Sequence, residues 1–397
     1  MEKTEKKYLR QMDDVRKVLQ HAKLDESTLL PVTQALYFPA EETQYKFLEL
    51  NEELLDKLKN GIPLTFRGNK EDKAVLCTDD KTYEVKEVET SNSLLLIPDL
   101  KFPEEMQSLN CTERILEHKD VINVFHTYYE VKLSKPKLKR LRTILNESSY
   151  RGSELESELV DSGVKMYSTN ELLDVIQASE VELKNALSKM QAFELNDKWR
   201  ILEFSYHVRV LSYFLNLIDE QSWNHEDIPA DEVDQILSEI VPSNIINYIL
   251  LTYCENCFEL NGKRHVRLIE NKVCRIIGEE LLKPTTTFEF NDFLRAWQGS
   301  VPEGLITNIC QLDGLVYIDN QLNRKVIHYC PEYELSEDIA ERIQYLFTLK
   351  EKWTFEEIKP YIEVFTTEKM DENAILTKYA RASKLNEIRV YSSKHGK

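Results

Sequence analysis

The sequence predicts an α+β protein, with an N-terminal antiparallel β segment followed by tandem winged-helix domains. Three observations lead to this prediction. Short segments with strand periodicity begin near Tyr45. Residues 350–391 read as strand, helix, turn, helix and strand behind a long amphipathic helix, which is the element order of a winged helix-turn-helix. That order recurs twice upstream in cap residues and apolar spacing, although not in the letters themselves.

Composition limits the class of protein. The chain has 397 residues, a length that suggests about three domains. Its 51 basic and 69 acidic residues give a formal net charge of -18, so the protein as a whole repels nucleic acid and any such contact must be local. The seven cysteines have no disulfide spacing, and no signal peptide or long apolar run is present, which indicates a reducing interior and no membrane association.

The first part of the chain is rich in strands. After a charged start, residues 13–24 have the pattern of an amphipathic helix. Strands are then predicted at 45–50, 63–68, 73–78, 81–86, 93–98 and 121–133, with a hairpin turn at Asp79-Asp80. These segments predict a small antiparallel sheet or partial barrel.

This sheet is expected to be incomplete. Leu94, Leu95, Leu96 and Ile97 form a continuous apolar run, which a half-solvated strand would not carry. We expect a partner chain to supply the missing strands and bind this run. The alternative is that residues 1–36 fold back over the sheet, because an edge strand can be covered in either way.

A basic segment leads into the first copy of the repeated unit. Residues 132–142 carry six cations and no acid, and they fit either a phosphate contact or a helix whose Leu138, Leu141 and Ile144 pack inward; we slightly prefer the helix. The acidic stretch 151–163 is predicted to be a mobile loop. The second helix of this copy begins with Glu180 and Glu182, which would repel phosphates, so its surface suits a protein partner.

Residues 206–267 are predicted to be a helical connector that ends in a hairpin turn at Asn261-Gly262, although a fourth, degenerate unit remains open. Its Cys254 and Cys257 lie in an apolar run that reads as a helix, and no second ligand pair completes four metal ligands. We therefore expect two helix cysteines and no metal.

In the second copy, Asn291 is expected to cap the first helix and Pro302 to start the second. That second helix has no basic residue. The only candidate phosphate contacts of the second copy are therefore Arg324 and Lys325 of its wing.

The third copy carries the best candidate DNA site. Asp371 is expected to cap a helix that covers residues 370–383. Cations concentrate in and after this helix, and those we assign to DNA binding are Lys378, Arg381, Lys384, Arg389 and Lys394. Lys378 and Arg381 are three apart and would share a helical face. The contacts would be mainly to phosphate, because no Arg/Asn pair is set for base edges.

Catalytic motifs are not found in this sequence. It contains no GxSxG or HExxH motif, and none of its ten glycines lies in a phosphate-binding loop. We therefore expect a protein that is not an enzyme and needs no cofactor.

Several stretches of sequence resemble a known family. They are RGNKEDKAVLCTDDKTYEVKEVETSNSLLLIP, DKWRILEF, QGSVPEG, KEKWTFEEIKPYI and AILTKYARAS, and the match runs in order from about Ala22 to Ser393. The sequence thus resembles the Dcc-one family of sister-chromatid-cohesion proteins, subunits of the alternative clamp loader of the replication factor C type. Of the basic positions, Lys378 and Arg381 match most clearly, within TKYAR.

The resemblance implies a nuclear, non-catalytic clamp-loader subunit. Its N-terminal strands would form a composite barrel with the large ATPase subunit and a very small subunit. Three winged helices would complete the chain and contact the leading-strand DNA polymerase and single- or double-stranded DNA, while the sliding clamp would be an indirect partner. The expected domains are 1–133 (β-rich, hetero-oligomerising), 134–205 (winged helix 1), 206–267 (helical connector), 268–332 (winged helix 2) and 333–397 (winged helix 3).

A second class of function stays open. The chain could be a winged-helix scaffold of another nuclear assembly, of the ubiquitin-ligase or transcription-initiation type, in which the basic C-terminus is incidental. Capture of a small β-rich subunit and a loader tail by the strand region would separate the two classes.

Overall fold

The structure, a computed structural model, describes residues 9–25, 30–40, 44–70, 72–107, 114–260, 263–321, 324–367, 370–385 and 387–394. It divides into two compact bodies. The amino-terminal body comprises 1–66, 73–78 and 83–134, and the carboxy-terminal body comprises 67–72, 79–82 and 135–397. The fold is mixed α and β with several small sheets, and none of the described sheets closes into a barrel.

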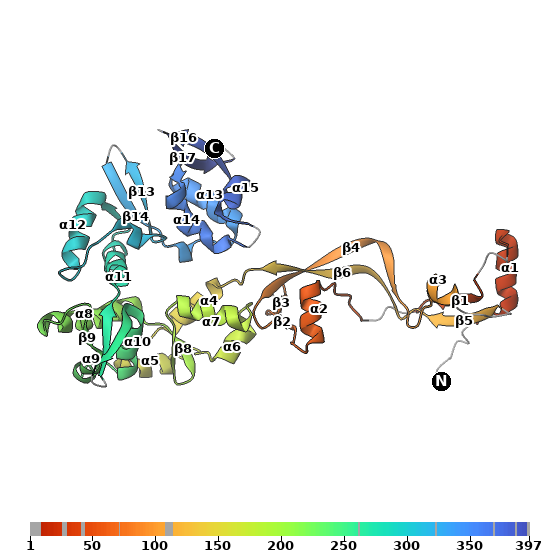
Figure 1. Ribbon diagram of the computed structural model, residues 1–397, viewed down its shortest axis with the longest axis horizontal. Helices are drawn as coiled ribbons and strands as arrows, with labels where there is room; N and C mark the ends of the chain where they lie inside the picture. Colours follow the sequence, from red (N-terminus) through yellow and green to blue (C-terminus); the bar gives the residue numbers. More distant parts are fainter. Residues whose placement is uncertain are drawn as a thin grey trace. The chain divides into compact units, whose positions relative to one another are not determined.

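The amino-terminal body is built on two sheets. Its elements are α1 (Met12–Ala22), β1 (Val32–Tyr37), α2 (Glu52–Lys59), β2 (Thr65–Arg67), β3 (Val75–Cys77), β4 (Thr82–Leu96), α3 (Pro103–Gln107), β5 (Ile115–Asp120) and β6 (Asn123–Ser134). One sheet has the order β2-β3-β4-β6, and β4 and β6 run side by side in it as a long ribbon (Figure 1). The other pairs β1 with β5 in parallel, so the expectation of a purely antiparallel arrangement is wrong.

Three further expectations for this body need correction. The strands predicted at 81–86 and 93–98 are parts of one strand, β4, because its pairing continues past the polar residues between them. The strand predicted at 45–50 is reduced to a bridge between Leu48 and Tyr129. Helix α2 was not foreseen; the Asn51 side chain accepts a hydrogen bond from the Leu54 N–H at its first turn.

The carboxy-terminal body contains four related repeats, in each of which helices are followed by a two-stranded hairpin; repeats 2, 3 and 4 also have a strand between their first two α-helices, which repeat 1 lacks. Repeat 1 has α4 (Lys139–Glu147), η2 (Ser153–Leu155), α5 (Glu156–Asp161), α6 (Thr169–Val175), α7 (Glu180–Lys189), β7 (Phe193–Leu195) and β8 (Lys198–Arg200). Repeat 2 has α8 (Phe204–Glu220), β9 (Ile228–Pro229), α9 (Ala230–Leu237), α10 (Ser243–Tyr253), β10 (Cys254–Leu260) and β11 (Lys263–Leu268).

The other two repeats follow directly (Figure 1). Repeat 3 has α11 (Glu270–Leu282), β12 (Thr287–Glu289), α12 (Phe290–Ser300), η3 (Ile309–Leu312), β13 (Val316–Gln321) and β14 (Arg324–Tyr329). Repeat 4 has η4 (Glu332–Glu334), α13 (Ile339–Leu349), β15 (Trp353–Thr354), α14 (Phe355–Ile362), η5 (Glu363–Phe365), α15 (Glu372–Tyr379), β16 (Ala380–Leu385) and β17 (Ile388–Ser393).

Strand order identifies repeat 2 as a full copy. In repeats 2, 3 and 4 the strand before the second helix pairs with the last strand of the hairpin, giving the orders β10-β11-β9, β12-β14-β13 and β15-β17-β16. The segment predicted to be only a connector therefore holds the fourth unit that the sequence left open. The expected helix cysteines are not in a helix, because α10 ends at Tyr253 and both Cys254 and Cys257 belong to strand β10.

Helix starts in this body follow from local sequence. Ser168, Ser179 and Thr354 form capping boxes with a glutamate three residues later, and Asp371 caps α15 as predicted. Repeat 3 departs from expectation. Glu289, not Asn291, caps α12. No α-helix follows Pro302; instead the chain reaches the short helix η3 through Gly304 at φ +96.

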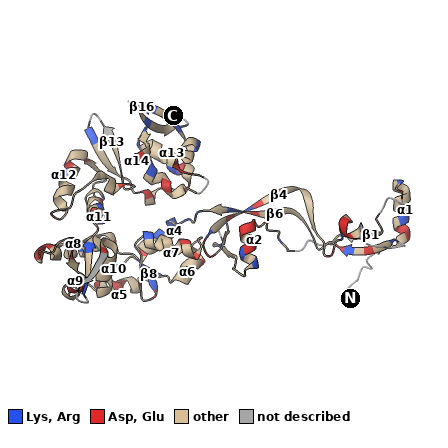
Figure 2. Ribbon diagram, viewed as in Figure 1, with Lys and Arg blue, Asp and Glu red and all other residues tan. Residues whose placement is uncertain are grey.

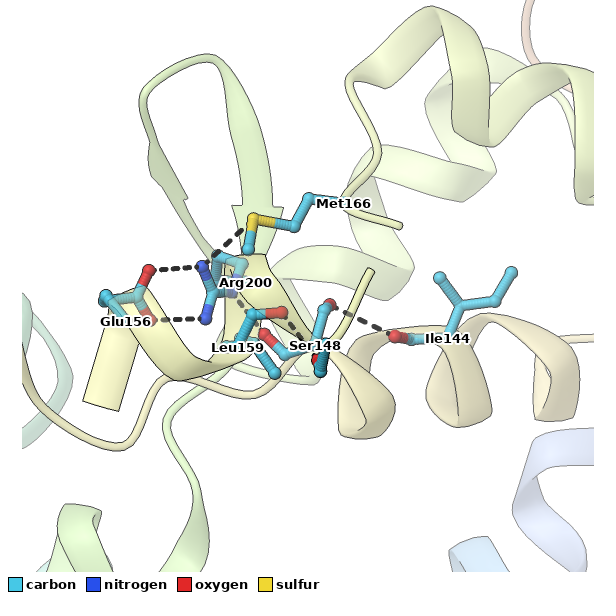
Figure 3. Close-up of polar contacts among 7 residues, drawn as sticks. Ile144, Ser148, Glu156, Leu159, Met166 and Arg200 are labelled. Atoms are coloured by element: carbon cyan, nitrogen blue, oxygen red, sulfur yellow. Dashed lines mark hydrogen bonds and ion pairs between the residues drawn. The ribbon is translucent and has the colours of Figure 1, made fainter. Parts of the chain in front are cut away.

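Arg200 fixes the segment that was predicted to be a mobile loop. The segment contains η2 and α5, and Glu156 at the start of α5 receives two hydrogen bonds from the guanidinium, 2.8 and 3.0 Å long (Figure 3). The Arg200 Nε–H donates to the Ser148 carbonyl at the end of α4. Because Arg200 is 1% exposed, this charge is neutralised inside the protein, and the acidic segment 151–163 is a folded part of repeat 1.

Contacts also join the last repeat to the first. The Glu337 carboxylate accepts from the backbone N–H groups of Leu138 and Lys139, where α4 begins, at 2.5 and 2.7 Å. The Lys135 ammonium donates to the Val364 carbonyl at 2.7 Å, and the Arg142 guanidinium lies 4.2 Å from the Tyr333 ring centre. Helix α4 begins at Lys139 and buries Leu141, Ile144 and Leu145, so the helical interpretation of the basic segment is confirmed for 139–142, whereas 132–134 are the end of strand β6.

Candidate nucleic-acid and partner interfaces

The terminal hairpin carries most of the predicted DNA-binding cations. Strands β16 and β17 pair with Arg381 opposite Ser392 and Lys384 opposite Arg389. Helix α15 ends at Tyr379, so the prediction that Lys378 and Arg381 share a helical face is wrong. Ala380 is already extended, with φ -126 and ψ 162, because pairing with β17 competes successfully with helix continuation.

Two cations face each other near the hairpin tip. Lys384 and Arg389 are directly opposed and both are exposed, and like charges in this position repel one another. The Arg389 guanidinium lies 5.2 Å from the centre of the Tyr391 ring, which is two residues along on the same face. Arg381 is on the opposite face of β16 because side chains alternate along a strand. An anion placed across Lys384 and Arg389 would relieve their repulsion.

The remaining two cations differ from each other. The Lys394 ammonium donates to the carbonyls of Thr377 and Lys378 at 2.8 and 2.6 Å, so it caps the C-terminus of α15. Lys378 is exposed, with its ammonium 5.0 Å from the Tyr379 ring centre. Asn373 and Thr377 lie on the same exposed side of α15. The sequence analysis did not name Asn373 and Thr377 as candidate contacts, because it considered only charged residues.

Segments with Lys and Arg and segments with Asp and Glu are both spread over the two bodies (Figure 2). The wing of repeat 3, which was named as a weaker candidate, begins its last strand with Arg324 and Lys325. The Lys325 ammonium lies 3.7 Å from the centre of the Phe290 ring. The terminal hairpin is thus the better-placed group of cations, because it combines Arg381, Lys384 and Arg389 on one pair of strands.

The apolar run predicted to bind a partner lies at the end of β4. Leu94, Leu95 and Leu96 are 37%, 39% and 44% exposed, and Ile97 follows the strand and is half-buried. Consecutive strand residues point to opposite faces, so both faces of the ribbon carry exposed leucine here. The Leu96 carbonyl accepts from the Ile122 N–H, which joins the run to the start of β6. Within the described chain the three leucines remain partly exposed.

The sheet that contains β4 has outer strands at both sides. Strands β2 and β6 are the outermost members of the order β2-β3-β4-β6. Part of the outer side of β6 is used by the chain itself, because Tyr129 exchanges backbone hydrogen bonds with Phe47 and Glu49 at 2.8 and 2.9 Å. On the β6 side, an added strand could extend the sheet only beyond that bridge.

Glu180 and Glu182 have different surroundings. Glu182 accepts from the Ser179 N–H and hydroxyl and, at 2.6 Å, from the Thr82 hydroxyl, so it fixes the turn at 79–82 on α7. Glu180 is half-exposed and pairs with Lys184 at 2.6 Å. The hydrogen bond from Lys184 lowers the pKa of Glu180. Only Glu180 therefore presents its carboxylate to the surroundings of the helix.

Strongly shifted pKa values occur at buried packing positions. Burial lowers the pKa of His207 to about 4, and the imidazole Nε2 lies 3.0 Å from the Tyr253 hydroxyl. Burial also raises the pKa of Tyr333, whose hydroxyl donates to the Glu279 carboxylate at 3.0 Å. Across the described ranges, no group of three or more His, Cys, Asp or Glu side chains is placed to hold a metal ion. No described helix has the length and apolar character needed to span a membrane.

Comparison with known proteins gives a consistent result. Residues 45–362 match the family described as "Sister chromatid cohesion protein Dcc1". The chain is 36% identical over 390 residues to "Sister chromatid cohesion protein DCC1" of Homo sapiens, covering 97% of this chain and 98% of the relative. The protein of the same name from Danio rerio is 36% identical over 396 residues, covering 97% and 99%. That of Saccharomyces cerevisiae is 25% identical over 393 residues, covering 90% and 98%.

Proposed function

Because the chain belongs to the sister chromatid cohesion protein Dcc1 family, we propose that it is a non-catalytic nuclear subunit of an alternative replication clamp loader. In this proposal the four repeats are winged helices. The amino-terminal body binds the large ATPase subunit and the very small subunit, which complete a composite β-barrel. The chain bridges the loader to the leading-strand DNA polymerase and to DNA, and so supports loading or unloading of the sliding clamp and sister chromatid cohesion.

The observation that carries this proposal is the uncovered apolar surface of the amino-terminal body. Its core cluster consists of Leu54, Leu76 and Tyr83 with a few half-buried neighbours, while Leu94, Leu95 and Leu96 stay exposed. An apolar surface of this kind supports the proposal of a bound partner, because exposed contiguous apolar side chains gain free energy when another chain covers them.

Capture of the two loader subunits tests the proposal. Leu95→Glu in the full chain should reduce co-purification of the very small subunit and the ATPase subunit's tail by about a hundredfold or more, because a charge would be buried in the joint sheet. Val160→Glu is the matched control, since Val160 is 63% exposed and lies in the other body. Equal capture by wild type and Leu95→Glu would contradict binding through β4.

DNA contact by the terminal hairpin needs a separate measurement. Lys384→Ala with Arg389→Ala should weaken binding to a short duplex or single strand and reduce the slope of log K against log salt by about two, one for each lost phosphate contact. The control is Lys165→Ala with Lys352→Ala, two exposed lysines outside the hairpin. An unchanged slope in the hairpin variant would remove this assignment.

The alternative is a scaffold of another nuclear assembly, of the ubiquitin-ligase or transcription-initiation type. Its support is that four copies of one unit make up nearly all of the carboxy-terminal body. The capture experiment separates the two functions, because a scaffold of that kind would retain neither loader subunit.

A further inference from the structure

A groove of about 640 Å³ lies between repeats 1 and 2, apart from the apolar run of β4 and from the terminal hairpin. Its walls are the C-terminal half of α7 with the following hairpin, and the exposed side of α10. Both helices occupy the same position in their repeats. The volume is in the range of pockets that bind a small ligand or a few residues of a peptide.

The floor of the groove is aromatic and apolar. Phe193 and Tyr248 pack with their ring centres 5.2 Å apart and their planes tilted by 50°. The Trp199 indole N–H donates to the Thr169 hydroxyl at 2.9 Å, so the polar end of this side chain is satisfied. Leu251 on α10 is 68% exposed at the margin. This is the composition of a protein-binding anchor site, in which aromatic side chains receive an apolar residue.

The margin of the groove is positively charged. Its lining carries Lys184, Lys189 and Lys272 against Glu194, and Lys184 is also paired with Glu180 one turn earlier on α7. The Lys272 ammonium is held by the Thr252 carbonyl at 2.7 Å, which fixes its position. Lysine ammonium groups gathered along one groove favour an anionic ligand beside them.

We propose that this groove binds a short acidic peptide segment of a partner protein, with an apolar side chain seated on Phe193, Tyr248 and Trp199 and carboxylates beside Lys184 and Lys189. Charge complementarity sets the ligand class: the margin is basic in a chain whose net charge is -18. This binding is independent of the loader subunits and of the terminal hairpin.

Nucleic acid fits the groove less well. Phe193 and Tyr248 pack against each other and form a shared floor, whereas a base needs an open ring face on which to stack. A phosphate backbone that continued along α7 would meet the Glu180 carboxylate at its first turn. The exposed aliphatic Leu251 adds apolar contact area that an unstacked nucleotide does not need.

The test selects short random peptides displayed on phage against the full chain. We expect the selected peptides to be rich in Asp and Glu around one or two large apolar residues. Lys184→Glu with Lys189→Glu should weaken their binding, measured by fluorescence anisotropy at low salt, about tenfold or more. Lys59→Glu with Lys352→Glu changes the net charge equally outside the groove and should leave affinity within about twofold.

Leu251→Ser gives a second readout that does not depend on charge. It removes an exposed side chain, so folding should be unchanged, and peptide affinity should fall about threefold or more. If the double lysine variant fails to fold, Leu251→Ser alone tests whether the groove binds the selected peptides. Selected peptides without an acidic bias, equal binding to the groove variants, or displacement of bound peptide by an oligo-dT strand would each overturn the proposal.

Discussion

The two bodies use apolar side chains in opposite ways. Among described residues, the amino-terminal body has sixteen exposed large apolar side chains and only ten buried apolar ones. The carboxy-terminal body has twelve exposed and fifty-seven buried. The carboxy-terminal body thus holds its own cores, whereas the amino-terminal body leaves most of its large apolar side chains exposed. All four tryptophans lie in the carboxy-terminal body, so tryptophan fluorescence reports its unfolding alone.

The largest expected difference is between two leucines. Leu346 is 0% exposed in the core of repeat 4, and Leu346→Ala should lower the free energy of unfolding of its body by about 2–5 kcal/mol. Leu95→Ala should change the stability of the free chain by less than about 0.5 kcal/mol. Urea unfolding followed by fluorescence and far-UV circular dichroism measures both. A loss of several kcal/mol for Leu95→Ala would mean that the chain itself covers β4.

The buried Arg200 tests whether the acidic segment is part of the carboxy-terminal core. Arg200→Met leaves Glu156 and the Ser148 carbonyl without their donor and should cost about 2–4 kcal/mol in the same urea experiment. Adding Glu156→Leu should recover part of the loss, because the unpaired carboxylate is then gone. No destabilisation in Arg200→Met would show that the segment does not depend on this pair.

Acid should weaken the carboxy-terminal body through His207. Its folded pKa of about 4 lies below the unfolded value of about 6.5, so only the unfolded chain takes up the proton between these values. The stabilisation is complete above about pH 6.5 and falls as the pH drops toward 4, by up to about 3 kcal/mol. His207→Gln should flatten this part of the profile, and His126→Gln, an exposed site in the other body, should not. If the stability of His207→Gln fell equally steeply with pH, protonation of His207 would not be the cause of the acid destabilisation.

The smallest expected changes in stability come from replacing two glycines by alanine. A Cβ at Gly278 on α11 would lie 2.9 Å from the Leu312 side chain and 3.0 Å from the Trp297 ring, so Gly278→Ala should cost about 1–3 kcal/mol. Gly299 on α12 has nothing within 4 Å, and Gly299→Ala should stabilise by about 0.5–1 kcal/mol. Thermal unfolding followed by fluorescence compares them. A stable Gly278→Ala would show that α11 can shift away from the core.

Sequence reasoning succeeded where local chemistry decides structure. Asp371 caps α15 as the sequence predicted, because a cap acts within a few residues of the helix that it starts. The inward face of α4 also followed from the spacing of its leucines and isoleucine. It failed at 380–383, where helix-forming residues belong to a strand because the partner strand β17 lies nearby in space.

By itself, the sequence determined the mixed fold class, the repetition in the second part of the chain and the basic character of its end. Only the tertiary structure decided that repeat 2 is a full copy, that Arg200 holds Glu156, and that Lys394 caps α15 while Lys384 opposes Arg389. Helix caps and hydrophobic periodicity act over a few neighbouring residues and can be read along the chain. Strand pairing and buried ion pairs join residues that are distant in sequence, and their formation depends on packing that no local pattern encodes.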